Sequence, residues 1–134
     1  MAEFLKYYEI LLKKASVDIY SARKLYEDFQ KIDSELDIEV IMFHLQQSAE
    51  KCLKSILSFN EIYFPKVHDL EVLIKLVEDN KIPLKIDSDV LIDLSDFAVE
   101  GRYSVIHDDL VNAENYFVAT NKLFQQVKKL NSNT

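Results

Sequence analysis

The chain has 134 residues and a net charge of −7, with 49% apolar and 29% charged residues. These values suit one globular domain and argue against a disordered chain. A single glycine and two prolines argue against a many-turned β protein and against a glycine-rich phosphate loop. The acidic balance disfavours indiscriminate binding to phosphate backbones, so no DNA partner is expected.

Cysteine content and apolar runs suggest where the protein works. The single cysteine, Cys52, leaves no intramolecular disulfide and no cysteine-rich zinc site. The N-terminal stretch MAEFLKYYEILLKK mixes charged residues among apolar ones, unlike a signal sequence, and no run of 18 apolar residues occurs. We therefore expect a cytoplasmic protein. Membrane association is not expected either, since no predicted helix joins a basic face to an exposed apolar one.

The first predicted helix runs from about Phe4 to Lys31. Its apolar residues recur at steps of three, four and seven, which places them on one helical face: Phe4, Tyr8, Leu11, Ala15, Ala22, Leu25 and Phe29. Asp18 falls in the gap of that row. We therefore expect Asp18 to be buried and paired with a cation, in the first place Arg102 and otherwise Lys51.

A polar break at residues 32–37 separates this helix from a second one, about Leu36 to Phe59. Its apolar seam consists of Ile38, Ile41, Leu45, Cys52, Ile56 and Phe59. Pro65 forbids continuation of the helix through the next connector. A third, shorter helix is predicted from about His68 to Asn80, with its apolar residues at Leu70, Leu73, Ile74 and Val77.

Two further helices complete the chain. Asp87 or Ser88 can cap a fourth helix, about Asp89 to Glu100, after which Gly101 suits a left-handed C-terminal residue. The last helix is expected from about Leu110 to Leu130, and residues 131–134 form a tail. The pattern predicts one all-α domain over residues 1–134, an antiparallel up-and-down four-helix bundle with one additional short helix.

The second and third predicted helices carry a family signature. The string FHLQQSAEKCLKSIL (Phe43–Leu57), an aromatic-proline linker and then HDL (His68–Leu70) resemble the core motif of the HEPN family, whose name abbreviates higher eukaryotes and prokaryotes nucleotide-binding. Asp18 also matches a family habit of an aspartate within the first helix. Ser48 stands where the motif usually has alanine, and Val67 stands where threonine or serine often caps the third helix.

The resemblance implies a helical bundle that commonly forms a homodimer. HEPN proteins are often encoded beside a small nucleotidyltransferase. Some of these pairs are toxin and antitoxin, in which the HEPN member is a metal-independent ribonuclease, and others have no established activity. The resemblance therefore suggests a nucleotidyltransferase partner and either a nucleotide or RNA as a ligand.

The segment GRYSVIHDDL (101–110) bears on the choice between these functions. HEPN ribonucleases resemble it in having an arginine four to six residues before a histidine, here Arg102 and His107. Imidazole can take the proton of the ribose 2′-hydroxyl, and guanidinium can stabilise the developing phosphate charge. Against this reading, Tyr103 replaces the small polar residue expected after the arginine. Asp109 replaces a tyrosine of the toxin subset.

The sequence therefore favours an accessory HEPN module that binds a nucleotidyltransferase partner, and it leaves open a ribonuclease toxin that uses Arg102 and His107. Within the second predicted helix, His44, Gln47 and Lys51 share a stripe at steps of three and four, so they are the candidate contacts for a ligand or partner. Glu50 is expected to be a buried structural polar residue, as is Asp18. His68 fits a helix-start residue. No metal site and no cofactor are expected.

Overall fold

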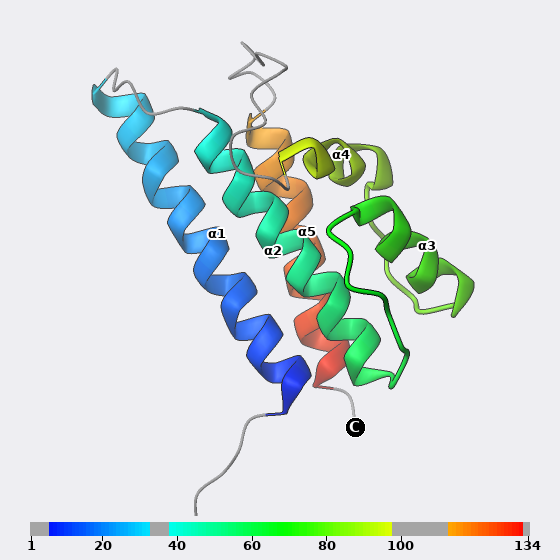
Figure 1. Cartoon of the computed structure of the whole chain (residues 1–134). Coiled ribbons are helices and arrows are strands. Elements are labelled where there is room, and N and C mark those ends of the chain that lie inside the picture. The colour runs from blue at the N-terminus through cyan, green and yellow to red at the C-terminus, as the bar shows by residue number, and fades with distance from the viewer. Residues whose placement is uncertain (1–5, 33–37, 98–112, 133–134) are drawn as a thin grey trace, which may run out of the picture.

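The computed structural model of the chain describes residues 6–32, 38–97 and 113–132, and its regular elements there are all helical. The long helices α1 (Tyr7–Ile32), α2 (Ile38–Phe59) and α5 (Ala113–Asn131) lie side by side, with α1 antiparallel to the other two (Figure 1). This arrangement is the all-α bundle that the sequence predicted. None of the helices in these three segments is long and apolar enough to cross a membrane.

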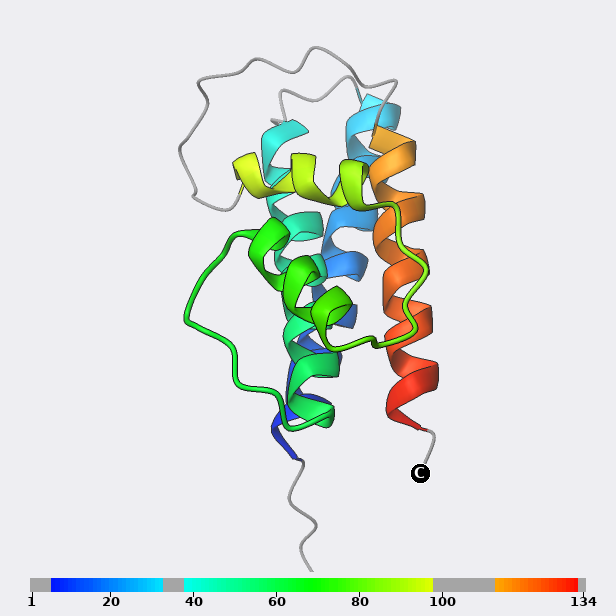
Figure 2. The same ribbon diagram turned by 90° about the vertical axis from the view of Figure 1, so that its right-hand side faces the viewer.

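Two short helices lie between α2 and α5 along the chain. Helices α3 (Leu70–Asp79) and α4 (Ser88–Asp93), with the 3₁₀ turn η1 (Leu94–Phe97), cover one side of the long helices (Figure 2). Helix α3 and η1 contact α2, and α4 contacts α5. These elements occupy the position that an unbroken fourth helix would take in a regular bundle.

Helix α2 is the centre of the bundle, because it contacts α1, α3, η1 and α5. Its apolar side chains that are at most 1% exposed are Ile41, Leu45, Ala49, Cys52, Leu53, Ile56 and Leu57. Burying each leucine or isoleucine contributes about 1.5–3 kcal/mol. Residues outside the predicted apolar seam of α2 are also buried, because other elements cover this helix on several sides. A surface helix is covered on one side only.

Helix α3 has the apolar face that the spacing predicted, and its start differs from the prediction by two residues. The buried residues of this helix are Leu70, Leu73, Ile74 and Val77. Asp69 is the N-cap, and its carboxylate accepts a hydrogen bond from the backbone N–H of Glu71 at 2.9 Å. His68 therefore precedes the helix, because the cap that satisfies the first turn lies one residue after it.

The last two helices also differ from the prediction at their ends. Asp87 caps α4, and the α-helical conformation ends at Asp93, where η1 follows. The rest of the predicted fourth helix lies within residues 98–112, outside the described segments. Asn131 was predicted to belong to a tail and is instead the last residue of α5. It is 8% exposed, and its Nδ2 donates to the Ser55 hydroxyl at 2.9 Å.

A non-glycine residue in the left-handed conformation lies two positions after the last residue of both α2 and α3. Glu61 has a φ of 58° and Lys81 a φ of 56°. After α2, the N–H of Ile62 donates to the carbonyl of Leu57 at 2.9 Å, and the equivalent bond from Ile82 after α3 is 3.2 Å. Both isoleucines pack against the core. This is the Schellman motif, which usually has glycine at the left-handed position because a Cβ atom is strained there.

Replacing either left-handed residue by glycine should stabilise the protein. Glu61→Gly and Lys81→Gly remove the Cβ strain at positive φ, and the greater freedom of glycine in the unfolded chain offsets part of that gain. We expect each change to raise the free energy of unfolding by about 0.5–1 kcal/mol. Urea unfolding followed by circular dichroism measures this quantity.

Lys75→Gly is the matched control, since Lys75 is an exposed lysine inside α3. There glycine should lower the free energy of unfolding by about 1 kcal/mol. A loss of stability in Lys81→Gly as large as that in Lys75→Gly would contradict the left-handed assignment.

Candidate functional site

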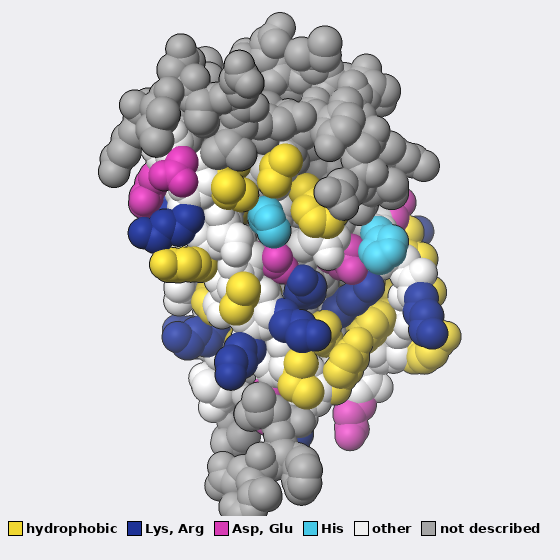
Figure 3. Space-filling model, turned by 60° about the vertical axis from the view of Figure 1, so that its left-hand side comes forward, with side chains coloured by type: hydrophobic (Ala, Val, Ile, Leu, Met, Phe, Trp, Pro, Cys, Tyr) yellow, Lys and Arg dark blue, Asp and Glu magenta, His cyan; other side chains and the backbone are white. Residues whose placement is uncertain are grey.

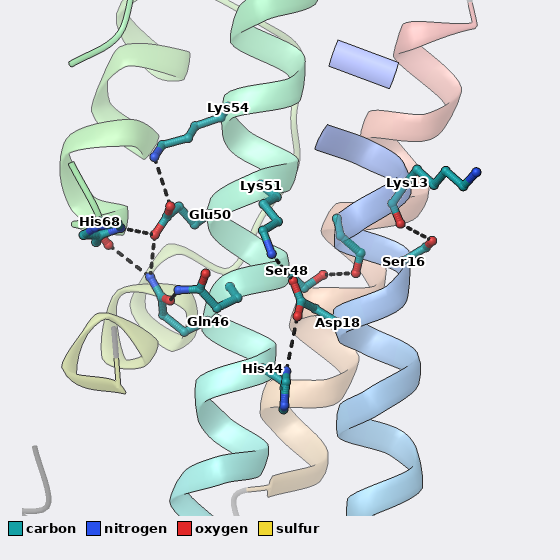
Figure 4. A network of polar contacts seen from close by, with 12 residues as sticks. Lys13, Ser16, Asp18, His44, Gln46, Ser48, Glu50, Lys51, Lys54 and His68 are labelled. Atoms are coloured by element: carbon teal, nitrogen blue, oxygen red, sulfur yellow. Dashed lines mark hydrogen bonds and ion pairs between the residues drawn. The ribbon is translucent and has the colours of Figure 1, made fainter. Parts of the chain in front are cut away.

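Helix α2 carries two rows of polar side chains that face different neighbours. One row contacts α1 and consists of His44, Ser48, Lys51 and Ser55, at steps of four, three and four. The other row faces the connector before α3 and consists of Gln46, Glu50 and Lys54, at steps of four. Steps of three and four keep each row on one side of the helix. Figure 4 shows His44, Ser48 and Lys51 of the first row and all three residues of the second row.

The first row is centred on Asp18 of α1. One carboxylate oxygen of Asp18 lies 2.5 Å from Lys51 Nζ, and the other lies 3.2 Å from His44 Nδ1. The exposed fractions of the side chains are 13% for Asp18, 24% for Lys51 and 29% for His44. A carboxylate this far from water needs a cation and hydrogen-bond donors, and α2 supplies them across the helix interface through Lys51 and His44.

Two serines extend the contact between α1 and α2. The Ser48 hydroxyl donates to the backbone carbonyl of Ala15 at 2.9 Å, and the Ser55 hydroxyl donates to that of Tyr8 at 2.7 Å. Ser48 is fully buried. An alanine at this position would leave the Ala15 carbonyl without the hydrogen bond from the serine hydroxyl. The polar row therefore ties α2 to α1 along much of their shared length.

The second row is centred on Glu50, which is buried. Its carboxylate lies 2.9 Å from Lys54 Nζ and 3.0 Å from His68 Nδ1. Gln46, which is fully buried, donates from Nε2 to the same carboxylate at 3.2 Å and to the carbonyl of His68 at 3.1 Å. These bonds fix the connector before α3 against α2, and Gln47 Nε2 donates to Gln46 Oε1 at 2.7 Å.

The two clusters have the same composition: one carboxylate, one lysine and one histidine. A carboxylate only accepts hydrogen bonds, so a neutral histidine beside it must carry its proton on Nδ1. In both His44 and His68 this leaves Nε2 as the acceptor, and no described residue bonds to that atom. Figure 3 shows histidine, lysine and acidic side chains gathered on this face.

With neutral histidines, each cluster has no net charge, because its lysine balances its carboxylate. Neither lysine is therefore a free cation that could hold a phosphate without competing with a carboxylate. Within the described segments, no group of three or more histidine, cysteine, aspartate or glutamate side chains is arranged to hold a metal ion.

The structure brings together some of the residues that the sequence selected. His44 and Lys51 meet at Asp18, so the pairing with Lys51, which was predicted as the second choice, is present. Gln47 bonds to Gln46 instead and does not join them. Arg102, the first choice of partner, lies outside the described residues, and so does His107.

Sequence reasoning did not recognise the cluster at Glu50. It expected Glu50 to be buried and did not connect it with Lys54 or with His68. The spacing of Gln46, Glu50 and Lys54 by four residues was a usable signal for a polar row. It could not show that the backbone of His68 lies opposite that row.

Burial changes the chemistry of the single cysteine. Cys52 is fully buried in α2, and this burial raises the pKa of its thiol to about 12. That value includes two smaller effects: a hydrogen bond with Ser48 lowers the pKa, and the negative charge of Asp18 raises it. The thiol therefore stays protonated in the folded chain at neutral pH and is not a nucleophile.

Comparison with known proteins gives one match. The family model of the HEPN domain matches residues 8–130, which is nearly the whole chain. No curated protein and no solved structure shows a significant match.

The pairing of Asp18 with Lys51 should be measurable as a coupling energy. A double-mutant cycle of Asp18→Asn and Lys51→Met should give a coupling of about 1–3 kcal/mol in the free energy of unfolding, because the pair is mostly buried and closely spaced. The exposed pair Lys24–Glu27, with charged atoms 3.9 Å apart, is the control. Its coupling should be about 0.5 kcal/mol or less. Equal couplings for the two pairs would refute the structural role of Asp18.

Stability should fall at alkaline pH because of Cys52. The unfolded thiol loses its proton near pH 8.5–9, while the folded thiol keeps it until about pH 12. Between these values the unfolded state binds fewer protons, so the free energy of unfolding decreases as pH rises. From pH 8 to pH 10, the wild type should lose about 1–2 kcal/mol more than Cys52→Ala does. An identical pH dependence of the two proteins would show that the thiol is exposed.

Proposed function

Since the chain belongs to the HEPN domain family, we propose that it acts as a non-catalytic binding module whose partner is a small nucleotidyltransferase. The family match covers residues 8–130, so the proposal concerns the whole helical domain. The choice of a nucleotidyltransferase follows from the resemblance of the α2 motif to HEPN proteins that are encoded beside such enzymes.

The polar contacts of α2 support the proposal that the module is non-catalytic. Asp18 and Glu50 are each neutralised by a lysine and bonded by a histidine. Cleavage of RNA needs a base and a cation that converge on the same ribose and phosphate. In the described segments, the signature residues instead hold α1, α2 and the connector before α3 together.

The same face of α2 supports a nucleotide-binding role. The proposed contacts are His44, Gln47 and Lys51, whose side chains are all partly exposed. His44 Nε2 can accept a hydrogen bond from an amino or hydroxyl group of a nucleotide, since its Nδ1 is engaged by Asp18. Lys51 would then share its charge between Asp18 and the ligand.

We also propose that the chain forms a homodimer. The support is the family resemblance, together with tyrosines that remain exposed in one chain: Tyr7 is 58% exposed and Tyr63 is 88% exposed. Exposed aromatic residues of this kind are enriched at protein interfaces. Sedimentation at micromolar concentration that shows only a 15.7 kDa species would contradict this proposal.

The second candidate function is a metal-independent endoribonuclease toxin that uses Arg102 and His107. One specific feature favours it: the spacing of these two residues, which resembles the motif of HEPN ribonucleases. Tyr103 and Asp109 depart from that motif. Both candidate catalytic residues lie outside the described segments, so the choice depends on an activity measurement.

An RNA-cleavage assay separates the two functions. Purified wild type, Arg102→Ala and His107→Ala are incubated with labelled single-stranded RNA and with transfer RNA, in the presence of EDTA. We expect no cleavage above the buffer level by any of the three proteins, and no growth arrest when the wild type is expressed alone. His44→Ala serves as a control for the α2 face.

Cleavage by the wild type in EDTA that disappears in His107→Ala would overturn the proposal and establish the ribonuclease. Such a loss counts only if His107→Ala unfolds at the same urea concentration as the wild type. If His44→Ala rather than His107→Ala abolished cleavage, the α2 face itself would be catalytic, which would also overturn the proposal.

A further inference from the structure

A groove runs between the N-terminal half of α1 and the C-terminal half of α5. Its volume is about 590 Å³, and the half-buried side chains of Tyr8, Leu12 and Phe124 supply its apolar lining. Two turns further along, Arg23 of α1 lies 4.4 Å over the ring of Phe117 of α5 and bridges the helices. Among the described residues, no such cation–π contact joins the N-terminal half of α1 to the C-terminal half of α5, where apolar side chains line the groove instead.

The groove is positively charged. Lys13 of α1 and Lys128 of α5 line it, both exposed, and neither forms an ion pair with a described residue. The single acidic residue in the lining, Glu9, accepts a hydrogen bond from the backbone N–H of Lys6 at 2.9 Å, so it serves the first turn of α1. Two lysines thus remain available, although the chain as a whole carries a net charge of −7.

The outer side of α1 continues this surface. Lys13, Ser16 and Tyr20 follow one another at steps of three and four, so Tyr20 lies next to the groove lining. Tyr20 is 64% exposed, and Lys24 Nζ lies 5.6 Å from its ring centroid. The neighbouring Val17 is 57% exposed. Figure 3 shows lysine and apolar side chains interleaved on the face of the molecule that includes α1.

Helix α1 therefore joins a basic face to exposed apolar residues, and the sequence-based expectation that no helix does so was wrong. The expectation failed because it considered the apolar residues of α1 that face the core and left out the exposed ones, Val17 and Tyr20. The α1–α5 surface consists of Leu12, Lys13, Val17, Tyr20, Phe124 and Lys128.

We propose that the α1–α5 surface binds a helical segment of a protein partner in which apolar side chains are flanked by aspartate and glutamate. The proposal rests on the binding function proposed above and identifies the docking face of that module. Apolar side chains of the segment pack on Leu12 and Phe124, as in other complexes in which an amphipathic helix lies in a groove. Its carboxylates pair with Lys13 and Lys128, which complements the charge of the groove.

Charge and apolar exposure argue against other occupants. A second copy of this chain would set lysines against lysines if the two surfaces met face to face, which is unfavourable. A nucleic acid would gain from Lys13 and Lys128, but its phosphates would gain nothing from Leu12 or Val17, and the net charge of −7 would repel it. An acidic protein segment uses both the cations and the apolar residues.

Selection of peptides tests the proposal without a known partner. Helical peptides with a fixed leucine stripe and randomised flanking positions are displayed and selected on the full-length wild-type chain. The enriched peptides should be acidic. A labelled synthetic copy of one of them is then titrated by fluorescence anisotropy against exposed-site variants, each checked for its fold by circular dichroism.

Val17→Glu should weaken binding by about tenfold or more, since it opposes an acidic segment with a like charge. Lys13→Gln combined with Lys128→Gln should weaken it roughly threefold to tenfold, as expected for two exposed ion pairs. The matched controls lie elsewhere: Val72→Glu on α3, and Lys75→Gln combined with Lys122→Gln. They should change the Kd by less than about twofold.

No enrichment, enrichment of neutral or basic peptides, or unchanged binding by Val17→Glu would overturn the proposal. Binding of poly-uridylate RNA or of anionic phosphatidylglycerol vesicles that depends on Lys13 and Lys128, without peptide binding, would assign the surface to those ligands and also overturn it. Failure of the proposed function has a different readout. It would appear as RNA cleavage that depends on His107, with the peptide results unchanged.

Discussion

The carboxylate of Asp18 lies between the first two helices, and the arrangement of the bundle depends on its neutralisation there. Asp18 faces α2 and is largely withdrawn from water, so an unpaired charge would favour separation of α1 from α2. Lys51 and His44 both come from α2 and both reach the same carboxylate. Because two partners on one helix converge on one residue of the other, the contact sets the register of α1 on α2 as well as adding stability.

Glu50 repeats this arrangement in the second polar row of α2, which faces the connector before α3. Through His68 and Gln46 it holds the connector that leads into α3, and α3 in turn covers α2. Most of the polar residues in the family signature therefore act within the fold, which explains why a signature so rich in histidine, glutamine and lysine need not mark a catalytic centre. The proposed docking of a partner uses a surface that these pairs leave exposed, the outer side of α1 with its lysines and apolar residues.

The spacing of apolar residues predicted the helices. It did not predict the polar contacts between them. All four buried positions of α3 follow from spacing, since an apolar face depends only on the helical repeat. The family signature predicted the bundle, and the family match covers residues 8–130. The cluster at Glu50 could not be predicted, because spacing does not show which backbone lies opposite a polar row. The left-handed Glu61 and Lys81 were missed because the usual signal for such an end is glycine, and neither helix has one there.

Hydrogen exchange of backbone amides in Asp18→Asn tests most directly whether the signature residues hold the helices together. If they do, amides in the middle of α1 and in the facing part of α2 should exchange about tenfold faster than in the wild type, which corresponds to a loss of about 1.4 kcal/mol. Exchange in α3 should change much less, since α3 is held through Glu50. Unchanged exchange rates in α1 would contradict the account, because Asp18 would then contribute nothing to the contact between the two helices.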